Sequence, residues 1–142
     1  MSVLELIDVF VFGSNRAGKH GKGAAADARD FYGAIRWRGE GIQGPGLFGT
    51  SYGIPTKDRW LKILSLEQIE RHVKRFLDYA ADHPEYRFLV TRVGCGLSGY
   101  QDHQIAPMFK GAPANCVFDP EWAPFGLPTW TTPPHSSPTK GL

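Results

Sequence analysis

The run of residues 9–12, VFVF, is the sequence feature that most restricts the fold. All of its residues are β-branched or aromatic, and Gly13 ends the run. A short apolar run of this kind predicts a strand buried on both faces, as in a parallel sheet covered by helices. A chain of 142 residues has room for one such domain, so we expect a single site.

The rest of the chain alternates strands with helices. Ser65 and Gln68 form a capping box before residues 66–81, whose apolar side chains recur on one stripe of a predicted helix. Shorter helices are predicted at 23–33 and 102–109, and extended segments at 34–37, 51–56, 87–93 and 115–118. This order predicts a three-layer α/β/α fold with a mostly parallel central sheet.

Composition excludes several classes of protein. The formal net charge is only +2 and no long basic run occurs, so charge gives no support to a nucleic-acid tail. Cys95 and Cys116 lack metal-site spacing and fit a reducing compartment. The apolar stretch at the N-terminus is too short, and contains too many acidic residues, for a signal peptide or a membrane span. We therefore expect a cytoplasmic protein that does not enter the membrane.

The C-terminal segment differs in composition from the rest. Residues 123–142 hold five of the eleven prolines and show no hydrophobic periodicity. We predict a folded domain over residues 1–122 and a proline-rich tail over residues 123–142.

The stretch after the first strand resembles a P-loop. Residues 13–19 match G-x-x-x-x-G-K, but His20 stands where a P-loop has the Ser or Thr that binds magnesium. The strand predicted at 87–93 also ends in Val93 rather than in an acid that could hold the metal. Both departures count against a nucleotide triphosphatase.

A second glycine loop lies at residues 94–99. It matches G-x-G-x-x-G, follows a predicted strand, and is followed by Asp119 about one βα unit later. An NAD(P)-binding protein is therefore one alternative, although the helix after the loop is short for a βαβ crossover and contains Pro107.

The two glycine loops both follow strands, so both should open at the carboxyl edge of the sheet, where open α/β folds bind ligands. Their exposed N–H groups, with the positive end of the helix that starts near residue 23, could hold a diphosphate from both sides without a metal.

The motifs resemble those of macro domains, which bind ADP-ribose. The resemblance covers residues 8 to 119, with an Asn after the first strand, G-K-G-A-A opening a helix, and G-C-G-L-S-G after a later strand. It implies a macro-domain fold and no cofactor or metal. The partner it implies is a small-molecule ligand, ADP-ribose or a derivative, or else an ADP-ribosylated macromolecule. The predicted ligand-binding residues are Asn15, His20, Gly21, Lys22, Gly23, Ala24, Gly94, Cys95, Gly96, Leu97, Ser98, Gly99 and Tyr100.

The letters GCGL at 94–97 are similar to the branch that contains terminal ADP-ribose protein glycohydrolase. In that branch a Lys attacks the anomeric carbon of the distal ribose, and an Asp directly after G-C-G-L assists. Lys57 matches the Lys, whereas Ser98 stands at the Asp position. A hydroxyl cannot act as a carboxylate base, so Asp102 or His103 would have to take that role.

The sequence thus predicts ADP-ribose binding and leaves catalysis open. One hypothesis is hydrolysis of an ADP-ribosyl or O-acyl-ADP-ribose bond, with Lys57 as nucleophile and Asp102 or His103 as acid or base. The alternative is a module that recognises or sequesters an NAD-derived ligand without turning it over, which the serine at position 98 favours.

Overall fold

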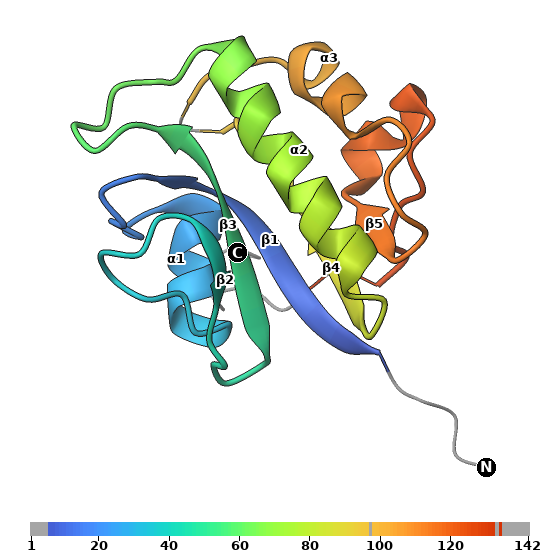
Figure 1. Ribbon diagram of the computed structural model, residues 1–142, viewed down its shortest axis with the longest axis horizontal. Coiled ribbons are helices and arrows are strands. Elements are labelled where there is room, and N and C mark those ends of the chain that lie inside the picture. The colour runs from blue at the N-terminus through green and yellow to red at the C-terminus, as the bar shows by residue number, and fades with distance from the viewer. Residues whose placement is uncertain (1–5, 97, 133, 135–142) are drawn as a thin grey trace.

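A computed structural model describes residues 6–96, 98–132 and 134 of the chain (Figure 1). A five-stranded sheet with the order β2-β3-β1-β4-β5 forms its centre. The strands are β1 Ile7–Asn15, β2 Gly41–Gln43, β3 Thr50–Lys57, β4 Tyr86–Val90 and β5 Cys116–Phe118. Only β2 and β3 pair antiparallel, and the other three pairs are parallel. The predicted α/β fold with a mostly parallel sheet is confirmed.

Helices cover both faces of this sheet. Helix α1 (Gly23–Phe31) packs on one face, and α2 (Leu66–Asp82) packs on the other with three short helices (Figure 1). These are α3 (Asp102–Ile105) and the 3₁₀ helices η1 (Ala106–Phe109) and η2 (Pro120–Phe125). The sheet and its helices therefore form the three layers that the sequence predicts.

Strand β1 supplies side chains to both hydrophobic cores. Val9 and Val11 lie in the core beneath α2, whereas Phe10 and Phe12 lie in the core beneath α1. All four are at most 3% exposed. This alternation follows from the two-residue period of a strand, and it confirms that residues 9–12 are buried on both faces.

Helix α2 begins at the predicted capping box. The Ser65 hydroxyl accepts a hydrogen bond from the Gln68 N–H (3.1 Å), and the Gln68 side chain accepts one from the Ser65 N–H (2.9 Å). The apolar stripe of the helix is buried against the sheet, as its spacing predicts; the buried residues are Ile69, Val73, Phe76 and Ala80.

The extended segment predicted at 34–37 is wrong. These residues form a loop with a turn, and Trp37 has a φ of 74°. Their N–H groups bond to other segments instead of to a neighbouring strand: Ile35 donates to the Gln43 side chain (2.7 Å) and Trp37 to the Gly18 carbonyl (2.8 Å). The strand of this region, β2, lies within the glycine-rich segment 39–49 that predicts turns.

Two further elements differ in length from their predictions. Strand β4 ends at Val90, three residues before the predicted end at residue 93. The helix predicted at 102–109 is a short α3 followed by η1, which has Pro107 near its start. Proline has no N–H to continue an α-helical bond pattern.

After η2 the chain runs beside β5 and pairs with it. The Phe118 N–H donates to the Pro128 carbonyl (2.8 Å), and the Trp130 N–H donates to the Phe118 carbonyl (3.0 Å). Thr129 therefore forms a parallel bridge with Phe118. Within the described part of the chain, no helix combines the length and the apolar character that crossing a bilayer requires.

Candidate functional site

A cavity of about 610 Å³ lies at the carboxyl ends of β1, β3 and β4. Both glycine loops line it, as their positions after neighbouring parallel strands predict. Its lining contains four cationic side chains and, among the described residues, no carboxylate. The lining residues are Gly13, Ser14, Asn15, Lys19, Gly21, Lys22, Gly23, Ala24, Ala25, Thr56, Lys57, Leu61, Arg92, Gly94, Gly96 and Ser98.

Asn15 shapes the first loop. Its side-chain amide donates to the Lys19 carbonyl (2.6 Å), and its carbonyl oxygen accepts from the Lys19 N–H (2.9 Å). The neighbouring Ser14 hydroxyl donates to the Gly39 carbonyl. These bonds fix the turn that leads from β1 to α1, so Asn15 both lines the cavity and closes its loop.

The N-terminus of α1 opens into the cavity without a side-chain cap. Lys22 occupies the N-cap position in an extended conformation and makes no capping hydrogen bond. The first-turn N–H groups of Gly23, Ala24 and Ala25 have no partner within the helix, and all three residues line the cavity. Space is also open at Gly21, where an added Cβ would meet no atom within 4 Å. An uncapped helix N-terminus of this kind favours the binding of an anion.

The second glycine loop approaches the first closely. A Cβ added to Gly13 would lie 3.3 Å from the Gly94 nitrogen, so the backbones pass each other with little room. Gly94 and Gly99 have φ values of 77° and 79°, which other residues rarely adopt. Tyr100 anchors the loop, since its hydroxyl donates to the Leu64 carbonyl (2.6 Å). Leu97 lies outside the described residues.

Ser98 lines the cavity but is held in a structural hydrogen-bond chain. Its hydroxyl donates to the Thr56 hydroxyl (2.9 Å), which donates to the Ser14 carbonyl (3.1 Å). Ser98 is 6% exposed, so this chain ties the second loop to β3 and β1. Lys57, at the end of β3, lies half-buried in the lining.

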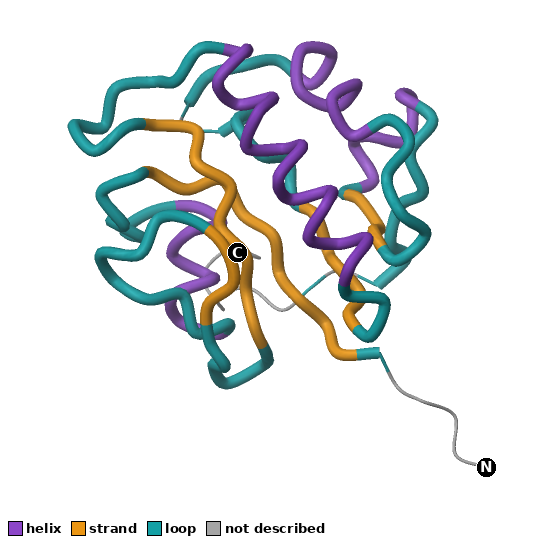
Figure 2. Tube along the Cα trace, in the orientation of Figure 1, coloured by secondary structure: helices purple, strands orange, loops and turns teal. Residues whose placement is uncertain are grey.

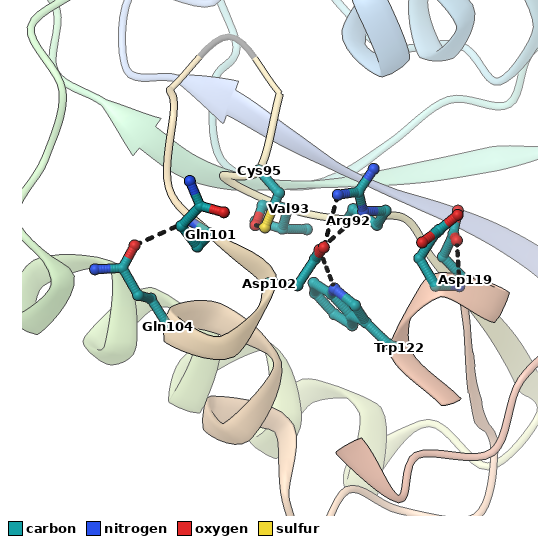
Figure 3. Close-up of polar contacts among 9 residues, drawn as sticks. Arg92, Val93, Cys95, Gln101, Asp102, Gln104, Asp119 and Trp122 are labelled. Atoms are coloured by element: carbon teal, nitrogen blue, oxygen red, sulfur yellow. Dashed lines mark hydrogen bonds and ion pairs between the residues drawn. The ribbon is translucent and has the colours of Figure 1, made fainter. Parts of the chain in front are cut away.

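Arg92 is a cavity residue that the sequence prediction missed. Its Nε and Nη2 donate to the two oxygens of Asp102, at 2.8 and 2.7 Å (Figure 3). The Trp122 indole N–H also donates to Asp102 (2.7 Å). This carboxylate therefore fixes the position of the guanidinium at the cavity wall. The available signal was an arginine two residues before the second glycine loop, at the end of a predicted strand.

The same bonds set the ionisation of Asp102. Hydrogen bonding from Arg92 is the main cause that lowers the pKa of Asp102 to about 2, and the Trp122 indole adds to it. Asp102 is thus a carboxylate committed to its own partners, and it does not line the cavity. His103, the other candidate acid or base, is exposed on α3 and is not part of the lining either.

His20 lies beneath the first loop and does not line the cavity. It is 3% exposed, and its Nε2 is 2.9 Å from both the Ile35 and the Arg38 carbonyl oxygens. Two carbonyl neighbours require that Nε2 carry the hydrogen. Its ring packs perpendicular to the Phe12 ring, with the centroids 5.3 Å apart. His20 therefore joins the first loop to the loop that precedes β2.

Three other predicted residues lie beside the cavity without lining it: Cys95, Gly99 and Tyr100. Burial is the main cause that raises the pKa of the Cys95 thiol to about 12, and the charge of Asp102 adds to it. A thiol of this kind is a poor nucleophile at neutral pH. The structure thus brings together Asn15, Gly21, Lys22, Gly23, Ala24, Lys57, Gly94, Gly96 and Ser98.

The sheet order, the helices on both faces and the cavity at the carboxyl edge define a macro-domain-like fold. A macrodomain protein from Streptomyces coelicolor superposes with a TM-score of 0.53, at 17% sequence identity, over 84% of this chain and 92% of that chain. A protein of unknown function from Bacteroides thetaiotaomicron superposes with a TM-score of 0.55, at 14% identity, over 75% and 80% of the two chains.

These similarities establish the fold. No protein-family model matches the sequence, and no curated protein matches it.

Proposed function

We propose that this protein binds ADP-ribose or a closely related NAD-derived nucleotide in the cavity at the carboxyl edge of its sheet. The observation that carries the proposal is the cavity lining, in which two glycine loops and four cations converge with no carboxylate among the described residues. The shared fold with a macrodomain protein supports the same class of ligand.

The lining suits a diphosphate in particular. The uncapped N-terminus of α1 offers N–H donors, and the cationic side chains lie around it: Lys19, Lys22, Lys57 and Arg92. Backbone donors and fixed cations can neutralise a diphosphate without a metal ion. The volume of about 610 Å³ is in the range of small-molecule sites and leaves room for the sugars on either side.

The alternatives from the sequence fit this lining less well. A magnesium-dependent triphosphatase needs hard oxygen ligands, and the position after Lys19 is the buried His20. An NAD(P)-binding fingerprint needs its glycine loop to open a long helix, whereas α3 spans only Asp102–Ile105 and begins beyond Gly99.

Calorimetric titration with ADP-ribose, NAD and ATP, with and without magnesium, tests the proposal. We expect ADP-ribose to bind most tightly and magnesium to have no effect. Arg92→Ala should raise the Kd for ADP-ribose at least about tenfold, since hydrogen bonds from a charged donor contribute about 1.5–3 kcal/mol. Arg87→Ala is the matched control, because Arg87 forms the same two-bond pair with Asp8 at the opposite end of β4. Magnesium-dependent ATP preference would contradict the proposal.

Hydrolysis of an ADP-ribosyl or O-acyl-ADP-ribose bond is the second candidate function. The position of Lys57 in the cavity favours it, because an amine there could reach the anomeric carbon of a bound ribose. The bonding of Ser98 and Asp102 to structural partners favours the binding module instead.

Incubation of glutamate-linked and O-acetyl ADP-ribose substrates with the wild type and Lys57→Ala distinguishes the two. Because no carboxylate among the described residues lines the cavity with Lys57, we expect little or no turnover and retained ADP-ribose binding in both proteins. Rapid turnover that Lys57→Ala abolishes would establish the hydrolase. Rapid turnover that survives the substitution would remove Lys57 from the mechanism.

A further inference from the structure

The positive charge of the chain is concentrated in three loops. Segments 16–22, 36–38 and 57–62 contain eight cations and a single carboxylate, Asp58, a net charge of +7. The remaining eight cations and thirteen carboxylates of the chain give −5. The near-neutral total therefore hides a strongly basic region. We call it the basic face; its cations are Arg16, Lys19, Lys22, Arg36, Arg38, Lys57, Arg59 and Lys62.

The three loops lie together in space. The Arg16 N–H donates to the Lys57 carbonyl (2.9 Å), which joins the first loop to the third. The Trp37 N–H donates to the Gly18 carbonyl (2.8 Å), and His20 bonds the loop that contains Trp37. In Figure 2 all three loops project from the same side of the sheet.

The cations of the basic face have no carboxylate partner in the part of the chain that the structure describes. Within residues 6–96, 98–132 and 134, none of the eight forms an ion pair. The one carboxylate, Asp58, accepts backbone hydrogen bonds from the N–H groups of Trp60 and Lys62. The arginines elsewhere in this part of the chain are all paired with carboxylates: Arg29, Arg71, Arg75, Arg87 and Arg92.

Two tryptophans project from the same loops. Trp37 is 61% exposed and Trp60 is 72% exposed, whereas Trp122 is fully buried. The guanidinium of Arg36 lies 4.6 Å from the Trp37 ring centroid, and that of Arg59 lies near the Trp60 ring. Burying large apolar rings of this kind would be favourable, yet both remain in water beside cations that form no ion pair. Their exposure therefore indicates that a binding partner covers them.

Backbone strain points to the same loops. Trp37 (φ 74°) and Leu61 (φ 64°) are the non-glycine residues with positive φ among the described residues, and both lie at the basic face. Strained conformations of this kind persist where surrounding structure holds them, often at binding sites. Leu61 and Lys57 also line the cavity, so the basic face continues into it.

We propose that the basic face binds single-stranded nucleic acid next to the cavity. The cations contact the phosphates, and Trp37 and Trp60 stack against unpaired bases. An acidic peptide would satisfy the charges but offers no planar rings for the tryptophans. A duplex keeps its bases stacked and out of reach. This inference does not depend on the ADP-ribose proposal, because both tryptophans and five of the eight cations lie outside the cavity lining; these cations are Arg16, Arg36, Arg38, Arg59 and Lys62.

Fluorescence anisotropy with a labelled oligonucleotide of about 16 nucleotides tests the proposal. Single-stranded DNA, single-stranded RNA, a duplex of the same length and a poly-glutamate peptide are compared over a series of salt concentrations. We expect one or both single strands to bind at least tenfold more tightly than the duplex, and the peptide not to compete. Equal binding of duplex and single strand, competition by the peptide, or no binding at low salt would overturn the proposal.

Variants separate stacking from charge. Trp37→Ala with Trp60→Ala should weaken single-strand binding at least tenfold, whereas Phe125→Ala, which truncates an exposed ring on η2, should not change it. Arg38→Glu with Lys62→Glu should reduce the salt dependence, and Lys74→Glu with Lys110→Glu should not. Unchanged binding by the double tryptophan variant would overturn the proposal. Retained ADP-ribose binding by these variants, and retained oligonucleotide binding by Arg92→Ala, would show that the two sites fail independently.

Discussion

Asp102 acts on the cavity through Arg92 rather than through contact with a ligand. The carboxylate accepts both Arg92 donors and the Trp122 indole, and it has a pKa lowered to about 2, mainly by Arg92. The sequence places Asp102 near the site but does not show whether its side chain faces the cavity or other residues. Its partners are an arginine ten residues earlier and a tryptophan twenty residues later, and only the tertiary fold brings them together.

The lowered pKa predicts how stability depends on pH. Because the folded-state pKa of Asp102 lies below its ordinary value of 3.8, its charge stabilises the fold above that value, and the contribution is lost as pH falls toward about 2. Asp102→Asn keeps an acceptor for Trp122 but lacks the charge. We expect the variant to be less stable by about 1 kcal/mol at pH 7.

Urea unfolding of the wild type and Asp102→Asn between pH 2 and pH 7 checks this prediction. The difference in the free energy of unfolding should narrow as pH falls from about 4 to about 2. A difference that stays constant over this range would mean that the charge of Asp102 does not contribute to stability.

His20 shows why a residue within a correctly predicted loop can still be misjudged. Local sequence places it between two glycines of the cavity loop, which favours contact with a phosphate. Its partners are the carbonyl of Ile35, in the segment 34–37 that is wrongly predicted as extended, and the carbonyl of Arg38 just after it. A contact between two irregular loops leaves no periodic signal in the sequence.

Helices α1 and α2 begin in contrasting ways. The N-terminus of α2 is capped by its own side chains, Ser65 and Gln68, and neither residue lines the cavity. The N-terminus of α1 has Lys22 at its cap position, with no side-chain acceptor. The sequence predicts the first because a capping box is a local pattern. The uncapped N-terminus of α1 suits a helix end that is left open for an anionic ligand.

A new cap on α1 should therefore have opposite effects on stability and binding. Lys22→Ser would supply a hydroxyl to the first-turn N–H groups, and we expect the free energy of unfolding to rise by about 1 kcal/mol. The Kd for ADP-ribose should rise more than in Lys19→Ser, which removes a cavity cation without adding a cap. Denaturant unfolding and calorimetric titration measure the two effects. Tighter binding by Lys22→Ser would show that these N–H groups do not hold the ligand.

The sheet was predictable where the pattern is local and uniform. Residues 9–12 are a continuous run of β-branched and aromatic residues and lie within β1, which is longer than predicted at Ile7–Asn15. The extended segment predicted at 51–56 lies within β3, Thr50–Lys57. Strand β2 was not predictable, because Gly41–Gln43 sits among glycines and pairs with β3 only through tertiary contact. The edge strand of a sheet depends on its neighbour for both its register and its existence.

At the scale of the whole molecule, the boundary predicted at residue 122 remains to be tested. Phe118 of β5 exchanges backbone hydrogen bonds with Pro128 and Trp130, so the segment after η2 covers the open edge of the sheet. We expect a chain ended after residue 132 to match the full chain in stability. A chain ended after Trp122 should lose about 2 kcal/mol, from two backbone hydrogen bonds.

Thermal and denaturant unfolding of the two shortened chains makes the comparison. Equal stability of both would support a domain that ends at residue 122. It would also mean that the strand-like segment at 128–130 adds nothing to the fold.

The parallel pairing of β1 with β4 joins two parts of the chain that are made at different times. The first glycine loop follows β1 and the second follows β4, and the cavity requires both. On the ribosome, a nascent chain that has emerged only as far as α2 possesses the first loop but no site. If the cavity binds ADP-ribose as proposed, the ligand can bind only after synthesis has passed residue 99, and a chain truncated before the second loop would not bind it.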